Sequence, residues 1–334
     1  MLVGTNQEKK VIEITSEKDI IVVGLSREQY TTDAFLVLPD DVLSNEYYAL
    51  TYGNNSQHNY GKEEFAIVAT EDNTSVNIAL PNGLGTFDIN LSKGETYQYQ
   101  KTEVGNWLTG TYITSNKKIA LLGGNSCVNI PQDGNVVACD HIVEQILPIN
   151  TWESEFITVP LKTRKNGDTF RFLASENNTT IEVNGSIVTN LNAGEYYETI
   201  LENSNYIKAN NPILVAQYSN SSSYDGVISD PFMALVPAFN QFDTTHIINT
   251  PSGFTDYINI VVPTTGVNDV ALDGVDIDTN EFKAVSGTTY SSAQIQIEGG
   301  KHTLTSDEKI GILGYGYANY DSYGYPSSLR LIKH

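Results

Sequence analysis

The chain has 334 residues, of which 40% are hydrophobic and 18% charged, a balance typical of a folded globular protein rather than a disordered one. Its 19 Lys and Arg stand against 40 Asp and Glu, and the net charge of −21 argues against nucleic acid and anionic membrane surfaces as partners. No apolar stretch reaches the roughly 18 residues of a membrane-spanning helix, so no membrane insertion is expected. Residues 1–7 lack the basic and apolar regions of a signal peptide, which favours a piece of a longer exported protein with further domains.

One seven-residue signature recurs four times along the chain, at intervals of 99, 94 and 97 residues. Each copy begins and ends with Ile or Leu and is mostly polar between them. A second signature, an Asp followed by apolar residues and a Pro, comes after each of the first three copies. The first signature occupies residues 14–20, 113–119, 207–213 and 304–310, and the second occupies 33–39, 140–148 and 230–237.

The constant order of these signatures predicts three pseudo-repeats of about 97 residues. Their expected boundaries are 11–110, 111–204 and 205–302, with residues 303–334 completing a lobe together with the N-terminal segment. We expect a compact pseudo-threefold arrangement, and an open row of three lobes is the alternative.

The elements expected within the repeats are short strands. Taken in chain order, the continuous apolar runs are 20–23, 119–122 and 213–216, and the alternating runs are 76–78, 181–183 and 270–272. Continuous runs are typical of strands buried on both faces, and alternating runs are typical of half-buried strands. Turn signals separate them, and no long amphipathic helix is present. The sequence therefore predicts an all-β protein with β-sandwich-like lobes.

The two cysteines, Cys127 and Cys139, lie in a polar stretch with 11 residues between them. This spacing suits a disulfide-closed loop, and a pair of cytosolic thiols is the alternative. The corresponding connections of the other repeats, 25–32 and 219–229, have no cysteine. Because recognition tends to lie where one repeat differs from the others, we predict that this loop binds a ligand, although a staple over a core edge explains it equally well. The candidate ligand-binding residues are Asn129, Ile130, Gln132, Asp133, Val136 and Val137.

Several ordered blocks resemble the domain at the amino-terminal end of the IgG Fc-binding protein of mucus, a family also found in bacterial surface proteins. The resembling blocks are 70–76, 91–97, 108–111, 124–131, 139–145, 215–218, 230–233 and 320–326. The resemblance implies an extracellular or cell-surface interaction module with a protein or glycan ligand. It also supports the bridge between Cys127 and Cys139, because both cysteines stand where the family pattern has them. It does not imply that this chain binds IgG.

Catalytic and metal-binding patterns in the sequence are weak. Cys139, Asp140 and His141 are neighbours in sequence, but adjacent side chains of a strand point to opposite faces, which disfavours a proton relay. Asp140 with Glu144 offers a pair of carboxyl groups for glycoside cleavage, yet Asp33 and Asp230 correspond to Asp140 in repeats without the other groups, so a turn or cap role is favoured.

The five histidines have no metal-ligand spacing, and neither a metal nor a cofactor is predicted. The chain has 20 tyrosines, and five of them lie close together near the carboxyl end, at positions 315, 317, 320, 323 and 325. Tyrosine side chains at these positions suit either ligand recognition or packing between strands. The favoured function is therefore a non-catalytic adhesion or ligand-binding module. A rigid spacer and a glycoside-active enzyme are the alternatives.

Overall fold

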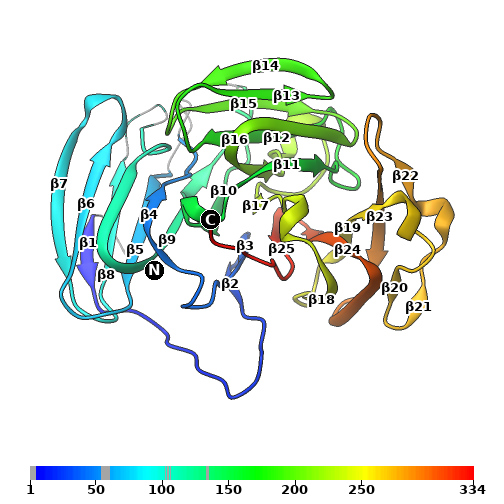
Figure 1. Cartoon of the computed structure of the whole chain (residues 1–334), viewed down its shortest axis with the longest axis horizontal. Helices are drawn as coiled ribbons and strands as arrows, with labels where there is room; N and C mark the ends of the chain where they lie inside the picture. Colours follow the sequence, from blue (N-terminus) through cyan, green and yellow to red (C-terminus); the bar gives the residue numbers. More distant parts are fainter. Residues whose placement is uncertain (1–4, 54–60, 102, 104, 106, 133–134) are drawn as a thin grey trace.

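The computed structural model describes residues 5–53, 61–101, 103, 105, 107–132 and 135–334. Strands make up 54% of it and helices 6%, so the prediction of an all-β protein is confirmed. The strands form three curled sheets placed around a common centre, together with one separate hairpin (Figure 1). Among the described residues, no helix is both long enough and apolar enough to cross a bilayer.

The bounds of the strands follow the three sheets along the chain. The first sheet contains β1 (Asn6–Glu8), β4 (Ser44–Tyr48), β5 (Glu63–Ala69), β6 (Thr74–Leu80), β7 (Gly85–Leu91), β8 (Thr96–Lys101), β9 (Tyr112–Val128) and β10 (Asp140–Gln145). The second contains β11 (Glu153–Thr158), β12 (Asp168–Ala174), β13 (Thr179–Val183), β14 (Ser186–Leu191), β15 (Tyr196–Leu201), β16 (Asn205–Tyr218) and β17 (Met233–Leu235). The third contains β18 (Asp243–Asn249), β19 (Thr255–Pro263), β20 (Ala271–Leu272), β21 (Val275–Asp276), β22 (Lys283–Ala284), β23 (Tyr290–Ile297), β24 (Lys301–Ala318) and β25 (Asp321–Pro326).

The separate hairpin consists of β2 (Val23–Glu28) and β3 (Thr31–Leu36). The one α-helical turn in the described residues, α1 (Ser222–Asp225), lies in the connection between β16 and β17. Short 3-10 turns span Pro81–Gly83, Ile149–Thr151, Phe239–Gln241, Thr264–Gly266 and Thr279–Glu281.

One long strand, β9, β16 or β24, organises each sheet. The N-terminal half of β9 pairs with β4 and β6, and its C-terminal half pairs with β5 and β10. β16 lies in the same way between β11 and β13 and then between β12 and β17, and β24 between β18 and β20 and then between β19 and β25. The apolar ends of the repeated signature are fully buried in these strands, at Ile113, Ile119, Ile207, Ile213, Leu304 and Ile310. The division into three repeats remains a prediction.

The first copy of the signature behaves differently. Residues 9–22 contain no strand and form an extended excursion, seen at the bottom of Figure 1, so the expected buried strand at 20–23 is wrong. Ile14 and Ile20 are 55% and 54% exposed, whereas the corresponding Ile113 and Ile119 are fully buried. The reason is that no sheet flanks this copy, and the ladder begins only at Val23, where β2 meets β3.

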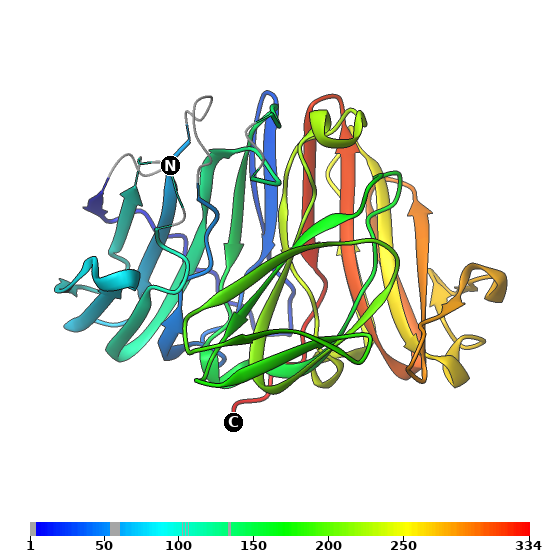
Figure 2. The same ribbon diagram turned by 90° about the horizontal axis from the view of Figure 1, so that it is seen from above.

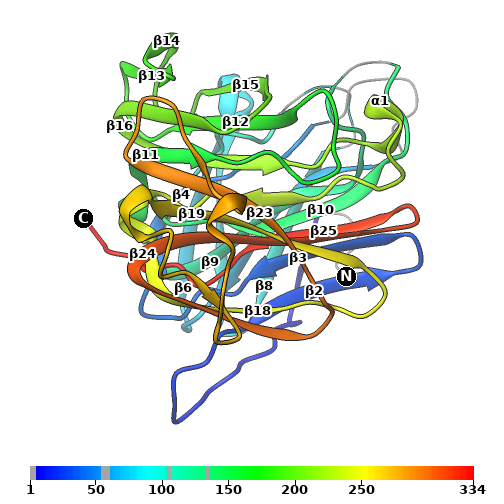
Figure 3. The ribbon, with the colours of Figure 1, turned by 90° about the vertical axis from the view of Figure 1, so that its right-hand side faces the viewer.

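Four hairpins meet at the centre of the molecule. They are β2–β3, β9–β10, β16–β17 and β24–β25, and their second strands pack against one another in the order β3, β10, β17, β25 and back to β3. All four tips point to the same end of the molecule, at the top of Figure 2 and on the right of Figure 3.

Candidate ligand-binding face at the hairpin tips

The end of the molecule formed by the described residues of the four hairpin connections, 29–30, 129–132, 135–139, 219–232 and 319–320, is called the tip face. Each connection presents one exposed large apolar side chain among its described residues. The exposed fractions are 60% for Tyr30, 45% for Val137, 56% for Ile228 and 46% for Tyr320. Exposed apolar groups collected from four distant parts of a chain are typical of an interaction surface.

Tyr30 and Tyr320 occupy the same place in two matching turns. Each is the second residue of a two-residue hairpin loop, and each has a positive φ, 63° for Tyr30 and 52° for Tyr320. Gly or Asn normally fills such a position, and a bulky residue there is a backbone outlier of the kind found at functional sites. An open hollow of about 570 Å³ lies between the two loops, lined by both connections and by Arg27 and Gly253.

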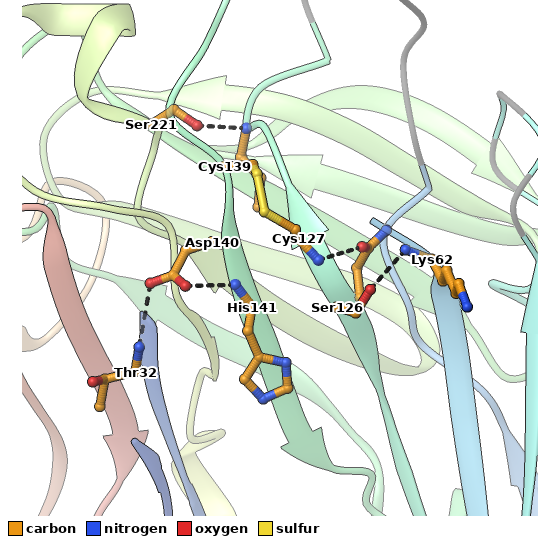
Figure 4. Close-up of a disulfide and its surroundings, with 10 residues drawn as sticks. Thr32, Lys62, Ser126, Cys127, Cys139, Asp140, His141 and Ser221 are labelled. Carbon is orange, nitrogen blue, oxygen red and sulfur yellow. Dashed lines mark hydrogen bonds between the residues drawn. A yellow bond between two sulfur atoms is a disulfide. The ribbon is translucent and has the colours of Figure 1, made fainter. Parts of the chain in front are cut away.

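Buried carboxylates fix the floor beneath the tips. Asp33 accepts hydrogen bonds from the backbone N–H groups of Val143, at 2.9 Å, and Met233, at 3.2 Å. Asp140 in turn accepts one from the backbone N–H of Thr32, at 3.4 Å (Figure 4). These bonds join β3 to β10 and β17, and Asp33 and Asp140 each also accept a local bond from the next backbone N–H, so these residues link hairpins in addition to any turn or cap role. The corresponding residue of the fourth hairpin, Asp321, was not predicted from the sequence.

The same carboxyl groups have perturbed acidity. Burial raises the pKa of Asp140 to about 8 and that of Asp230 to about 7, with the neighbouring carboxylates adding to both shifts. Burial also raises the pKa of Asp33 and Glu144 well above the usual range, although backbone N–H donors oppose this. The floor therefore favours protonated carboxyl groups.

The disulfide between Cys127 and Cys139 is present, and it closes the loop of the β9–β10 hairpin (Figure 4). The loop is attached to the connection that contains α1. Ile130 exchanges two hydrogen bonds with Ser221, and the backbone of Val137 exchanges two with the hydroxyl of Ser223.

The predicted ligand-binding residues of this loop have different environments. Asn129, Ile130 and Val136 are buried, Gln132 is half-buried and donates to the carbonyl of Gly53, and Val137 is exposed. Asp133 lies outside the described residues. The structure thus brings one of the six residues to the surface of the tip face, and it places three beneath it.

Asp140, His141 and Glu144 do not converge. The imidazole of His141 extends away from both the Asp140 carboxyl group and the disulfide (Figure 4). Cys139 is oxidised. Glu144 is 1% exposed and accepts a hydrogen bond from the backbone N–H of Leu235, at 3.1 Å. In the part of the chain that the structure describes, no cluster of three or more His, Cys, Asp or Glu is arranged to hold a metal ion.

Most of the tyrosines near the carboxyl end pack in the core, and one is exposed to solvent. Tyr315, Tyr317, Tyr323 and Tyr325 are buried, and Tyr320 alone among these five is exposed. Sequence reasoning did not identify Tyr30, Ile228 or Tyr320 as site residues. Their places in two-residue loops follow from the strand pairing on either side of Gln29-Tyr30 and Asn319-Tyr320, which only the structure shows.

The sequence matches the model of the IgGFc binding protein family over residues 33–316. The chain belongs to the IgGFc-binding protein family. A curated relative, the human IgGFc-binding protein, is 24% identical over 337 residues. That alignment covers 96% of this chain and 6% of the relative, so the chain spans a small part of the length of its IgGFc-binding relative.

Likeness to solved structures is low. An α-L-rhamnosidase of Streptomyces avermitilis is 10% identical, with 87% of this chain and 41% of the other covered and a TM-score of 0.19. A Pleurotus ostreatus lectin is also 10% identical, with 55% and 78% covered and a TM-score of 0.15. With TM-scores this low, neither structure indicates the fold or the function of this IgGFc-binding family member.

Proposed function

We propose that this chain is a non-catalytic extracellular module that binds a protein or glycoprotein ligand through its tip face. The observation that carries the proposal is the presence of one exposed apolar side chain on each of four converging hairpin connections. Family membership supports an extracellular protein ligand, as the name of the human relative describes for that protein.

The tip face has the physical properties of a preformed binding surface. Its tips are held by hydrogen bonds that Asp33 and Asp140 accept from backbone N–H groups and by the bridge from Cys127 to Cys139, so little conformational entropy is lost on binding. Tyr30 and Tyr320 add large contact areas with few rotatable bonds. A rigid spacer needs neither these side chains nor the hollow between them.

The proposal is tested on a panel of glycoproteins, mucins, IgG Fc and isolated glycans. The decisive variant carries Tyr30→Ser, Val137→Ser, Ile228→Ser and Tyr320→Ser. Its matched control carries Ile187→Ser and Val275→Ser, which remove side chains that are 70% and 71% exposed on β14 and β21.

Binding by the four-site variant should fall at least about tenfold, since truncation of a well-placed interface side chain costs about 1 kcal/mol or more. The control should bind like the unmodified chain. Undiminished binding by the folded four-site variant, or an equal loss in the control, would contradict the proposal.

A further inference from the structure

A second concave site lies on the flank of the molecule, away from the hairpin tips. It is a cleft of about 330 Å³ on the outer face of the first sheet, between β5, β8, β9 and β10 and the β2–β3 hairpin. Its lining includes Ala66, Gln98, Leu122, His141 and Phe35. It is called the Ala66 cleft below.

The second and third sheets each have a position that corresponds to the Ala66 cleft, and in both sheets a segment of the preceding sheet occupies it. The strand registers place Ala66 opposite Gln98, Arg171 opposite Glu198, and Asn259 opposite Gln294. On the other side, the same three residues face Leu122, Ala216 and Leu313 of the long strands. Ala66, Arg171 and Asn259 are therefore corresponding residues of three sheets.

In the second sheet, this position holds a segment of the first. Arg171 is fully buried and donates from Nη1 to the carbonyl of Thr51, at 2.7 Å. The ring of Tyr52, the next residue, lies 3.7 Å from the guanidinium carbon of Arg171. Thr51 and Tyr52 follow β4, so an extended segment of one sheet packs on the outer face of the next.

The third sheet repeats the contact with different side chains. Asn259 donates from Nδ2 to the carbonyl of Pro160, at 3.1 Å, and Gln294 donates to the same carbonyl. Leu161, the next residue, is buried. Thr51 and Pro160 correspond, because each lies seven residues after the strand residue, Ser44 or Glu153, that pairs with the repeated Ile119 or Ile213.

The third copy of this segment, after β18, is also engaged, but beyond Thr250, the residue seven positions after Asp243. Arg27 of β2 donates to the carbonyl of Ser252, at 3.0 Å, and its guanidinium group lies 5.1 Å from the ring of Phe254. All three copies within the described residues therefore meet a neighbouring element. The Ala66 cleft is the corresponding position at which the described residues supply no such segment.

We propose that the Ala66 cleft binds an extended segment of another polypeptide, through a main-chain carbonyl followed by a large apolar or aromatic side chain. The two filled positions define this chemistry, with Thr51-Tyr52 in one and Pro160-Leu161 in the other. Gln98, whose amide also donates to Glu64 at 3.4 Å, occupies the position of Gln294, whose amide holds the Pro160 carbonyl. Because each copy within the described residues is already engaged, we take the occupant to be a segment of a second polypeptide. The inference is independent of the function proposed for the tip face.

Two further observations support a missing partner on this flank. His141 is 8% exposed and lines the cleft, and its buried ring nitrogens make no well-formed hydrogen bond within the described structure, with the Asn125 backbone as a nearby polar group. Lys10 also lines the cleft and leads into residues 11–21, where Ile12, Ile14 and Ile20 are exposed. Buried polar groups and apolar side chains are normally satisfied by a neighbour, so this flank has the character of an incomplete interface.

The experiment uses the full chain and two synthetic peptides of its own sequence, residues 47–53 and 157–163, with scrambled peptides as controls. Binding is followed by nuclear magnetic resonance at Ala66, the Gln98 amide and the His141 ring. We expect saturable shifts at these residues, because the peptides carry the segments that fill the corresponding positions. Ala66→Trp, which fills the cleft, should weaken binding at least about tenfold, the loss of roughly 1.4 kcal/mol.

The matched controls separate this site from the tip face and from folding defects. Val137→Ser and Ile187→Ser should leave peptide binding unchanged, and thermal melting checks that Ala66→Trp is folded. If Ala66→Trp does not fold, Gln98→Leu replaces it, since it removes the amide donor without adding volume. The proposal would be overturned if neither peptide caused a shift up to about 1 mM, the weakest affinity expected of a specific contact. It would also be overturned if the cleft variants bound the peptides as well as the unmodified chain does. Saturable binding of free monosaccharides but not of peptides would overturn it too.

Discussion

Oδ2 of Asp33 accepts a hydrogen bond of 3.2 Å from the backbone N–H of Met233, a residue 200 positions further along the chain. The same carboxyl group accepts a bond from the backbone N–H of Val143. One buried side chain thus holds three hairpins that belong to different sheets. Because the tips of these hairpins form the tip face, the carboxylates beneath them connect stability to the proposed function.

The buried carboxyl groups should make the protein less stable as the pH rises. The pKa of Asp140 is about 8 and those of Asp168 and Asp230 are about 7 in the folded chain, whereas an unfolded Asp has a pKa near 3.9. The folded state therefore binds more protons, and the stabilising contribution is complete below about pH 4 and lost as the pH rises through 7 to 8.

We expect the free energy of unfolding to fall between pH 4 and pH 8, by about 1.4 kcal/mol per pH unit for each group that ionises on unfolding. Urea unfolding at several pH values measures this. Asp140→Asn, which cannot ionise, should flatten the dependence. A stability that increases from pH 4 to pH 8 would show that these carboxyl groups are ionised in the folded state.

Glu144 should prove structural. Glu144→Ala leaves the backbone N–H of Leu235 without its acceptor and should lower the free energy of unfolding by about 1–3 kcal/mol. Glu144→Gln keeps an acceptor oxygen and should cost less. Chemical denaturation compares the two variants. A glycoside hydrolysis activity that disappears in folded Glu144→Ala would instead support the enzyme alternative.

Arg171 should contribute strongly to the contact between the first two sheets. It is fully buried, pairs with Glu198 at 2.7 Å and donates to the carbonyl of Thr51. Arg171→Met leaves Glu198 and Thr51 without this donor and should cost about 3–5 kcal/mol, the usual effect of breaking a buried ion pair. Lys208→Ala, at an exposed site on β16, is the control and should change stability by less than about 0.5 kcal/mol. Equal stability of both variants would contradict this role.

Reduction of the bridge between Cys127 and Cys139 should destabilise the chain by about 3 kcal/mol, because closing a short loop restricts the unfolded state. Thermal melting with and without reductant measures the effect. Intact mass after alkylation without reductant should show no modified thiol. Two alkylated cysteines in the folded chain would disprove the bridge and weaken the extracellular assignment.

Tyr30→Gly and Tyr320→Gly should separate stability from binding. Glycine adopts a positive φ without strain, so replacing a tyrosine in the left-handed conformation should stabilise the folded state by about 1–2 kcal/mol. The greater conformational entropy of glycine in the unfolded chain opposes this by about 0.5–1 kcal/mol. Stability should therefore be unchanged or slightly higher, while ligand binding at the tip face falls. Melting temperature and binding are measured on the same variants, with Ile187→Ser as control. Lower stability with normal binding would assign these tyrosines to the fold.

The sequence by itself determined the strand content and the places of the buried residues that recur in the repeated signature. The repeated apolar ends at Ile113 and Ile119, and their counterparts at 207–213 and 304–310, were recognisable because their spacing recurs along the chain, and all of them are buried. The bridge between Cys127 and Cys139 followed from two cysteines in one polar loop and from the family resemblance.

Only the tertiary structure decided which copies of the repeated signature have their apolar residues buried. Ile14 and Ile20 carry the same signature as buried residues elsewhere, yet they are exposed because no strands flank them. Tyr30 and Tyr320 are 290 positions apart, and nothing local shows that their loops border one hollow. The physical reason is that burial and proximity depend on what packs against a segment, and local periodicity does not contain that information.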